Sequence, residues 1–220
     1  MSKEFYVPMP TRKQELQNKE YDYRVLGFIL LHSNFTDYKA YGCSRNDLYG
    51  ETYTYFNKLD FGGYGMQNNS TFSKKIAKML KIDDSLINTE IRHNELIYKI
   101  DYAKEGKYFV TIPAPMLKEL VICCNSNVIR TYCALCYLLK DGSKQMSNKF
   151  IREQVGIASD NTMDTILKSL IKLGFIKREL KPTTVAKPTK NMTTMATYIV
   201  KEYVYTLTTF EQWEQLTNKL

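Results

Sequence analysis

The spacing of apolar residues between positions 112 and 155 predicts three helices and a short strand. Segments Ile112–Cys123 and Ser126–Leu139 carry apolar side chains three and four residues apart, which is the period of a helix with one buried face. The extended stretch Lys144–Met146 follows, and Ser147 is suited to cap a helix that continues to Val155. The expected order is helix, helix, strand, helix.

A further helix is predicted after a glycine turn. Gly156 to Ala158 predicts a tight turn, after which Ser159 or Asp160 can cap the next helix. The side chains expected in the core from the two helices around this turn are Phe150, Ile151, Val155, Met163, Ile166, Leu167, Leu170 and Ile171.

Gly174 predicts the end of that helix, because glycine adopts left-handed backbone at no steric cost. Beyond it, Phe175–Leu180 and Ala196–Leu207 have the apolar and β-branched composition of strands. A lysine- and proline-rich loop, Lys181–Met195, joins them. The two strands are therefore predicted to form a hairpin.

Residues Phe150–Lys177 (FIREQVGIASDNTMDTILKSLIKLGFIK) resemble the winged helix-turn-helix superfamily, both in the glycine turn and in the exit through glycine into a strand. The resemblance implies a bundle of three helices with a β-hairpin wing. It also implies that the second helix of the motif enters the major groove of DNA.

The first half of the chain has segments that parallel the second half. Tyr6–Pro10 (YVPMP) parallels Phe109–Pro113 (FVTIP), and the helical pattern of Arg24–Leu31 parallels that of Arg130–Tyr137. We therefore expect an α+β protein of two tandem winged-helix domains, residues 1–110 and 111–220. Each would be a three-helix bundle with a β-hairpin wing, and a C-terminal helix would follow the second domain.

The helix-turn-helix of the first domain is predicted near its end. Ser73–Ile82 resembles the first helix of such a motif, and Ile87 and Ile91 fit the buried positions of a recognition helix that begins near Asp84. Leu96–Ile112 is then expected to form the hairpin.

The first domain has an insertion relative to the second, residues 34–69, that is rich in tyrosine, glycine and asparagine. It allows an alternative register in which Ser44–Asp47 is a capping box and Ser70–Leu80 is the recognition helix. Both registers stay open at this point.

The C-terminal segment Thr208–Leu220 predicts an amphipathic helix. Thr209 and Gln212 have the spacing of a capping box, and Phe210, Trp213 and Leu216 share one face. We expect this face to dock on its own domain; the alternative is a contact in a homodimer.

Net charge is +8, and its distribution is uneven. The segment from Lys144 to Lys201 has 11 basic and 4 acidic residues. A basic face is typical of a protein that binds the phosphate backbone, although a solvated lysine surface has the same composition.

If the second helix of the motif enters a major groove about 12 Å wide, its exposed polar side chains reach base edges. Asparagine can pair with adenine, threonine can contact the methyl group of thymine, and lysine can reach guanine or a phosphate. The candidates in the second domain are Ser159, Asn161, Thr162, Thr165, Lys168 and Ser169.

Basic residues next to that helix are candidates for phosphate contacts, which position a protein on a duplex. In the second domain they are Lys149, Arg152, Lys177, Arg178, Lys181, Lys187 and Lys190. In the first domain the candidates are Lys74, Lys75 and Lys78 for phosphates and Asn88, Thr89 and Arg92 for bases.

Enzymatic chemistry has no clear signal in the sequence. A phosphate-binding loop of the G-x-x-x-x-G-K type is absent, and His32 and His93 are the only histidines. Cys133 and Cys136, near Cys123 and Cys124, have a spacing seen in zinc sites, but they lie on an apolar helix, where buried thiols are common. We expect no cofactor, no metal and no enzymatic activity.

The sequence has no apolar stretch of membrane-spanning length, so a cytoplasmic protein without membrane contact is expected. The tandem arrangement resembles the two-winged-helix replication initiators of plasmids, and single winged units recur in phage replisome organisers and repressors. The resemblance implies sequence-specific binding of double-stranded DNA by an initiator that recruits replication machinery. The alternatives are a transcription regulator of a mobile element and a winged-helix scaffold that binds proteins.

Overall fold

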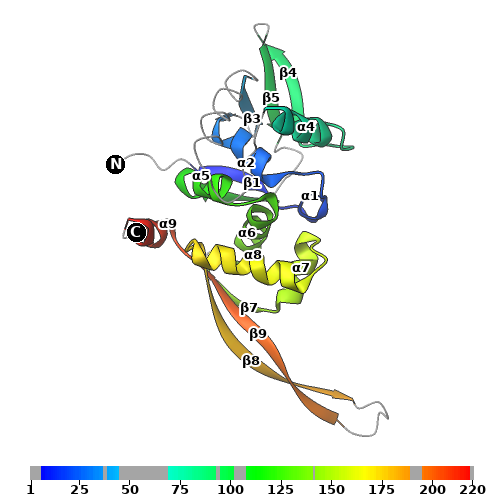
Figure 1. Ribbon diagram of the computed structural model, residues 1–220, viewed down its shortest axis with the longest axis vertical. Helices are drawn as coiled ribbons and strands as arrows, with labels where there is room; N and C mark the ends of the chain where they lie inside the picture. The colour runs from blue at the N-terminus through cyan, green and yellow to red at the C-terminus, as the bar shows by residue number, and fades with distance from the viewer. Residues whose placement is uncertain are drawn as a thin grey trace. The chain divides into compact units, whose positions relative to one another are not determined.

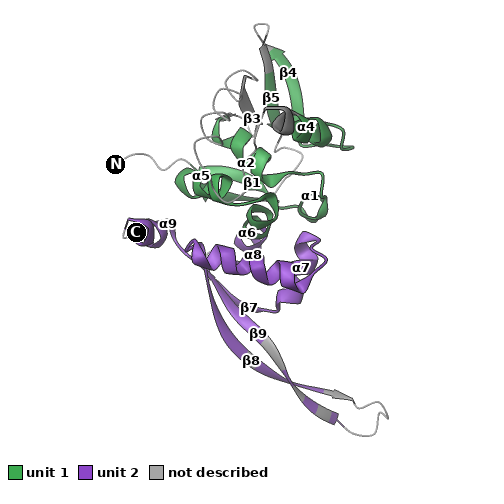
Figure 2. Ribbon diagram, in the orientation of Figure 1, with its two compact units in different colours: residues 1–133 green, residues 134–220 purple. Residues whose placement is uncertain are grey.

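Figure 1 shows the computed structural model of the chain, in which helices and strands are mixed as predicted. The structure describes residues 6–36, 39–44, 69–92, 95–101, 108–140, 142–188 and 195–218. The chain divides into two compact units, residues 1–133 and residues 134–220, which Figure 2 colours separately.

This division falls later than the predicted boundary between residues 110 and 111. The reason is a long-range pairing, because β6 pairs along its whole length with β1, at the other end of unit 1. The described elements of unit 1 are β1 (Tyr6–Pro10), α1 (Lys13–Gln17), α2 (Tyr23–Leu31), β2 (Asn34–Thr36), β3 (Lys39–Ser44), α4 (Asn69–Leu80), β4 (Ile87–Arg92), β5 (Glu95–Asp101), β6 (Phe109–Pro113), α5 (Ala114–Cys123) and the first part of α6 (Ser126–Leu139).

The paired strands β1 and β6 are the two segments that were matched by sequence. They run antiparallel, and the central pair is Pro8 opposite Thr111. Val7 and Met9 of β1 and Ile112 of β6 are buried. The two segments that match in sequence are thus neighbouring strands of one sheet in unit 1.

Two buried arginines, Arg24 and Arg130, stand at positions that match between the two halves of the sequence, and each one contacts the other half. Arg24 of α2 donates through Nε to the carbonyl of Val121 at 2.6 Å and through Nη2 to that of Ile122 at 3.0 Å. Arg130 of α6 donates through Nη2 to the carbonyl of Tyr21 at 2.6 Å. Each arginine therefore satisfies carbonyls of the other copy, which offsets part of the cost of burying its charge.

The second sheet of unit 1 has the strand order β2-β3-β5-β4, and α4 packs against α2 and β4. The predicted hairpin from Leu96 to Ile112 is wrong, because β5 pairs with β3 and β4, and β6 pairs with β1. The hairpin that follows α4 is β4–β5, in which Arg92 pairs with Glu95.

The predicted recognition helix from Asp84 is also wrong, since β4 occupies Ile87–Arg92. Asp84 has a left-handed φ of 57°, and the Ile87 amide donates to Ser85 Oγ in a turn, so the helical path ends there. A spacing of four residues fits both a helix and every second residue of a strand. In the strand, Ile91 is 75% exposed rather than buried.

Among its described residues, unit 2 has the last part of α6 followed by one sheet and three helices. Its three-stranded sheet has the order β7-β9-β8. The remaining elements of unit 2 are β7 (Ser143–Met146), α7 (Asn148–Val155), α8 (Asp160–Lys172), β8 (Ile176–Pro188), β9 (Met195–Leu207) and α9 (Phe210–Thr217).

Three strands of the second sheet of unit 1 have the same order as the three strands of the unit 2 sheet. In unit 1, β3 precedes α4 in the chain. In the sheet it pairs with β5, the second strand of the hairpin β4–β5 that follows α4. In unit 2, β7 precedes α7 and α8 in the chain and pairs with β9, the second strand of the hairpin β8–β9. The internal repetition inferred from the sequence therefore extends to strand pairing.

The hairpin of unit 2 is longer than predicted. Lys181–Pro188, expected in a loop, continues β8 opposite β9. Proline lacks the amide needed by an interior strand, but β8 is an edge strand in the order β7-β9-β8, where Pro182 and Pro188 are tolerated. The loop itself, residues 189–194, lies outside the described residues.

The expected core of unit 2 is mostly confirmed. The buried residues are Ile151, Val155, Met163, Ile166, Leu167 and Leu170. Phe150 and Ile171 differ from the prediction, with exposed fractions of 39% and 36%.

The C-terminal helix α9 docks on its own unit, as expected. Its capping box between Thr209 and Gln212 is formed in both directions. Trp213 is buried and stacks on Phe175, with 5.8 Å between ring centroids. Gly174 has the predicted left-handed φ, 76°, and a Cβ there would lie 3.3 Å from Leu216 Cδ1 on α9.

Candidate nucleic-acid interface

The turn between α7 and α8 fixes the direction in which α8 begins. Ser147 caps α7, and Gly156 ends it with a φ of 66°, both as predicted. Arg152 donates through Nη1 to the carbonyl of Ala158 at 2.6 Å, and its Nε lies 3.3 Å from Asp160 Oδ1. Arg152, predicted to contact phosphate, therefore holds this turn with only 21% of its side chain exposed.

The first turns of α8 present polar side chains to solvent. Ser159 Oγ accepts the Thr162 amide at 3.4 Å, so this candidate serves as the N-cap. Asn161, Thr162 and Thr165 are exposed. The Thr165 hydroxyl donates to the carbonyl of Asn161 at 2.9 Å, so its hydrogen is committed within the helix.

Asp164 joins α8 to the hairpin. Its Oδ1 lies 3.2 Å from Arg178 Nη1 on β8, and its Oδ2 lies 2.8 Å from Lys168 Nζ. The hydrogen bonds from Lys168 and Arg178 hold the pKa of Asp164 below its usual range. The Arg178 guanidinium also lies over the Tyr203 ring, 4.6 Å from its centroid.

Arg178, predicted to contact phosphate, is thus committed to Asp164 and Tyr203, with 14% of its side chain exposed. The Tyr205 hydroxyl, on the neighbouring strand, donates to Asn148 Oδ1 at the start of α7. Burial raises the pKa of Tyr205 to about 12, so the phenol is neutral at physiological pH. These contacts fasten the hairpin to both helices.

Other basic candidates of unit 2 remain accessible. Lys149, Lys177 and Lys181 are exposed, and 69% of the Lys168 side chain is exposed despite its ion pair. Ser169 is half-buried, and its hydroxyl donates to the carbonyl of Thr165. The Lys187 side chain and all of Lys190 lie outside the described residues.

In unit 1 the predicted candidates do not gather on one helix. Lys74 is exposed on α4, whereas Lys75 Nζ lies 2.5 Å from Asp22 Oδ2 and Lys78 Nζ lies 3.5 Å from Glu20 Oε2. The predicted base contacts of this unit fall on strand β4, where Asn88 and Thr89 are exposed; the Arg92 side chain lies outside the described residues.

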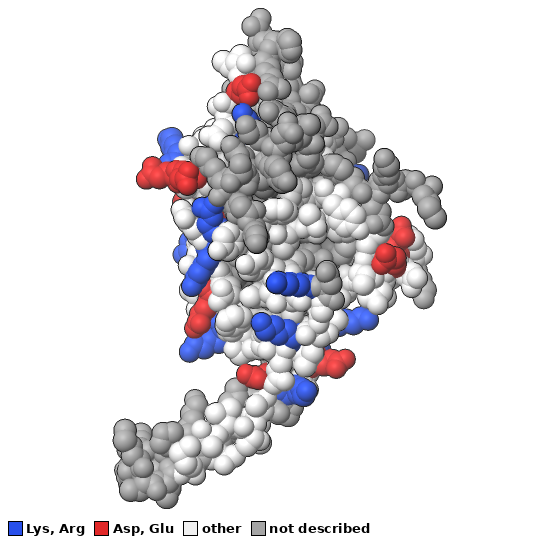
Figure 3. Space-filling model, turned by 180° about the vertical axis from the view of Figure 1, so that it is seen from behind, with Lys and Arg blue, Asp and Glu red and all other residues white. Residues whose placement is uncertain are grey.

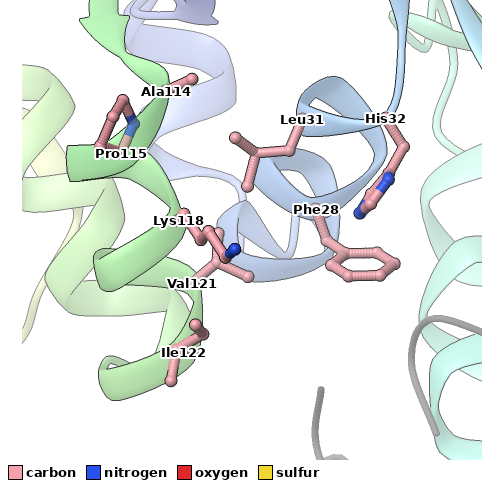
Figure 4. Close-up of a pocket in the computed structure, with 8 residues that line it drawn as sticks. All are labelled: Phe28, Leu31, His32, Ala114, Pro115, Lys118, Val121 and Ile122. Atoms are coloured by element: carbon pink, nitrogen blue, oxygen red, sulfur yellow. The ribbon is translucent and has the colours of Figure 1, made fainter. Parts of the chain in front are cut away.

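A separate pocket lies in unit 1 between α2 and α5 (Figure 4). It has a volume of about 370 Å³ and a mainly apolar lining. The ring of His32 packs 4.7 Å from that of Phe28, and Lys118 lines the opposite wall. The pocket contains none of the predicted site residues.

The cysteines near this region show no sign of ligation in the described part of the chain. Cys123 Sγ donates to Glu119 Oε1 at 3.0 Å, and burial raises the pKa values of Cys123 and Cys124 to about 12. No group of three or more histidine, cysteine, aspartate or glutamate residues could hold a metal ion among the residues described.

Comparison with known proteins identifies no family for this chain. No protein-family model and no curated protein matches the chain. Within the described residues, no helix has both the length and the apolar character needed to cross a membrane.

Proposed function

We propose that unit 2 is a winged helix-turn-helix domain that binds double-stranded DNA with α8 in the major groove. The order α6, β7, α7, α8, β8, β9 and the sheet order β7-β9-β8 support this assignment. In this reading α7 and α8 are the helix-turn-helix, and β8–β9 is the wing.

The observation that carries the proposal is the exposed start of α8. Asn161 and Thr162 project from its first turn, while Arg152 and Gly156 hold the preceding turn in place. The amide of Asn161 can pair with adenine through two hydrogen bonds, and Thr162 can contact an adjacent base. A rigid turn lowers the entropic cost of placing these groups in the groove.

Basic residues on both sides of α8 supply the phosphate contacts. Lys149 on α7 and Lys177 and Lys181 on β8 are exposed. Lysine side chains that neutralise phosphates release counterions, so the affinity of such a site falls steeply as salt increases. Lys187 and Lys190 are assigned the same role from the sequence.

Unit 1 is assigned as a second winged-helix domain in the alternative register. The helix α4 precedes the hairpin β4–β5, and the strand order matches that of unit 2, so α4 takes the place of a recognition helix. Lys74, exposed on α4, is the phosphate candidate of this unit, because Lys75 and Lys78 lie against the carboxylates of Asp22 and Glu20.

Two DNA-reading units in tandem favour an initiator of plasmid or phage replication that binds repeated origin sites and recruits replication machinery. A regulator of a mobile element would bind the same kind of DNA at a promoter. The two are separated by supplying the gene alone to a replicon that lacks its own initiator. Maintenance of that replicon supports initiation, and loss of it supports regulation.

The binding itself is tested with a duplex enriched from a random pool by capture on the protein. Asn161→Ala should weaken binding by about tenfold, the loss expected for one bidentate base contact. Gln215→Ala is the matched control, because it removes an exposed amide from α9. Equal affinities for the two variants, or no affinity of the wild type for any duplex at low salt, would contradict the proposal.

A further inference from the structure

The pocket between α2 and α5 lies beside contacts that fix these two helices of unit 1 relative to each other. Arg24 of α2 donates to the carbonyls of Val121 and Ile122 near the end of α5. Further along α2, a Cβ on Gly27 would lie 3.0 Å from Val121 Cγ2 and 3.3 Å from Leu117 Cδ1, so the helices touch at this point. The pocket is therefore formed before any ligand binds, as is usual for small-molecule sites.

The inner part of the pocket is apolar, and its outer part is open to solvent (Figure 4). Phe28 of α2 and Val121 of α5 are each only 2% exposed and line the inner part. Leu31 and Ile122 are half-buried, whereas Lys118 is exposed. Hydrocarbon placed against the inner lining leaves water, which favours binding in proportion to the apolar area buried.

Two side chains of the lining can bind an anion. Lys118 of α5 carries an ammonium group with three donors, and the imidazole of His32, at the end of α2, can donate from a ring nitrogen. Figure 4 shows His32 beside Phe28 and Lys118 on the helix opposite. Among the described residues that line the pocket there is no aspartate or glutamate. The lining therefore complements a ligand that is apolar along most of its length and negative at one end.

Surface charge alone would not mark this place as a site. On the face of the molecule shown in Figure 3, lysine and arginine side chains are interspersed with acidic and uncharged ones. Lys118 differs from an ordinary surface lysine because it lines an apolar pocket. Attraction between opposite charges is stronger where part of the surrounding water is replaced by apolar groups. The combination of a cation with an apolar pocket is the observation that carries the inference.

We propose that this pocket binds a small aliphatic carboxylate. Its hydrocarbon tail lies against Phe28 and Val121, and its carboxylate lies at the mouth, where Lys118 and His32 bind it. The volume of about 370 Å³ is near the lower end of the range for ligand pockets, about 300 to 1,000 Å³, which favours a medium-chain acid over a long-chain lipid. The pocket shares no residue with the proposed DNA contacts, so the inference does not rest on the proposed function.

Isothermal titration calorimetry of the full chain with octanoate, below the concentration at which it forms micelles, tests the proposal. Butyrate, octan-1-ol and octylamine are the comparison ligands, because they shorten the tail, remove the charge and reverse the charge. Lys118→Met removes the positive charge and keeps an unbranched side chain. Lys13→Met is the matched control, because Lys13 is exposed on α1 of the same unit and does not line the pocket.

Octanoate should bind wild-type protein and Lys13→Met equally, and the affinity should fall about fourfold for each CH₂ group removed toward butyrate. Octylamine should bind more weakly than octanoate, because Lys118 repels its charge. Lys118→Met should weaken the binding of octanoate about fivefold, the loss expected for one partly exposed charge pair, and leave that of octan-1-ol unchanged.

A second variant tests whether the ligand occupies the pocket. Leu31→Trp places a larger side chain in the pocket and should abolish the binding of both octanoate and octan-1-ol. Circular dichroism during heating checks that this variant folds. Lys118 is exposed, so Lys118→Met should fold like the wild type and decides the question if Leu31→Trp does not fold.

The inference is overturned if wild-type protein binds no octanoate, if octylamine binds as tightly as octanoate, or if Lys118→Met binds octanoate as tightly as Lys13→Met does. It is also overturned if octanoate does not bind and Leu31→Trp changes the mass in sedimentation, because the pocket is then covered by a second copy of the chain. None of these measurements involves DNA, so the inference can fail while the proposed function of unit 2 stands, and the proposed function can fail while octanoate binds.

Discussion

Arg178 and Lys177 are adjacent basic residues with different surroundings, and we propose a structural role for Arg178 and a phosphate contact for Lys177. Arg178 lies against Asp164 and over Tyr203, whereas Lys177 is exposed. We predict that Arg178→Met lowers the stability of unit 2 and leaves phosphate contacts intact. Lys177→Met should remove a phosphate contact and leave the stability of unit 2 unchanged.

The expected loss for Arg178→Met follows from two contacts. An ion pair whose carboxylate is about a third exposed contributes about 0.5 kcal/mol, because solvent screens it. A cation–π contact at a partly exposed ring contributes about 0.5 to 1 kcal/mol. Together they predict that the free energy of unfolding falls by about 1 to 1.5 kcal/mol.

Urea unfolding at pH 7 measures this loss. Trp213 is the only tryptophan of the chain and is buried in unit 2, so its fluorescence reports the unfolding of that unit. The pKa of Asp164 is lowered in the folded state, so its contribution is present above its unfolded pKa and is lost as pH falls through the folded value. The stability difference between Arg178→Met and wild type should therefore shrink below about pH 4.

The dependence of DNA affinity on salt gives the second readout. Each phosphate contact contributes about 0.9 to the slope of log affinity against log salt concentration. Lys177→Met should reduce this slope by about 1 with unchanged stability. The reasoning is refuted if Arg178→Met reduces the slope by as much while its unfolding free energy stays at the wild-type value.

Three further predictions concern the cores of the two units. Arg24→Met should lower the free energy of unfolding of unit 1 by about 3 kcal/mol, because two buried carbonyls lose a charged donor; circular dichroism during heating checks this, and an unchanged midpoint would contradict it. Trp213→Ala should cost about 3 to 5 kcal/mol without changing the mass in sedimentation, since α9 docks on its own unit; a new oligomeric state would oppose this reading. With pKa values of about 12, Cys123 and Cys124 should resist iodoacetamide in the native protein at pH 8, as peptide mass spectrometry can show; rapid labelling there would contradict the raised pKa values.

The helices of unit 2 could be predicted because their signals are local. Ser147, Ser159 and Thr209 each accept an amide from the first turn of the helix that they precede, and Gly156 and Gly174 supply the left-handed backbone that ends a helix. Such caps depend on residues within one turn of the helix, so the sequence alone shows them.

Unit 1 was harder to predict because its decisive contacts are distant in sequence. The pairing of Tyr6–Pro10 with Phe109–Pro113 joins segments that a local pattern can match but cannot place together. Ile87 and Ile91 fitted a helix by spacing, yet the β-branched residues between Ile87 and Arg92 belong to a strand paired with β5.

For the candidate site, the sequence predicted which polar and basic residues lie on and near α8 better than it predicted the contacts that each of them makes. Asn161, Thr162 and Thr165 are exposed as expected. Arg152 and Arg178 form ion pairs with nearby carboxylates, Asp160 and Asp164, and so hold the turn between α7 and α8 and the hairpin β8–β9. The spacing of Asp164 and Lys168, four residues apart on a helix, was the available signal that Asp164 is an acceptor for basic neighbours.

Cross-linking with 5-iodouracil tests most directly whether α8 enters the major groove. Iodine replaces the methyl group of thymine, which projects into that groove, and light joins it to the side chain in contact. Mass spectrometry of the bound enriched duplex should find the cross-link on α8, at or near Thr162. Cross-links confined to other elements, with none on α8, would contradict the account.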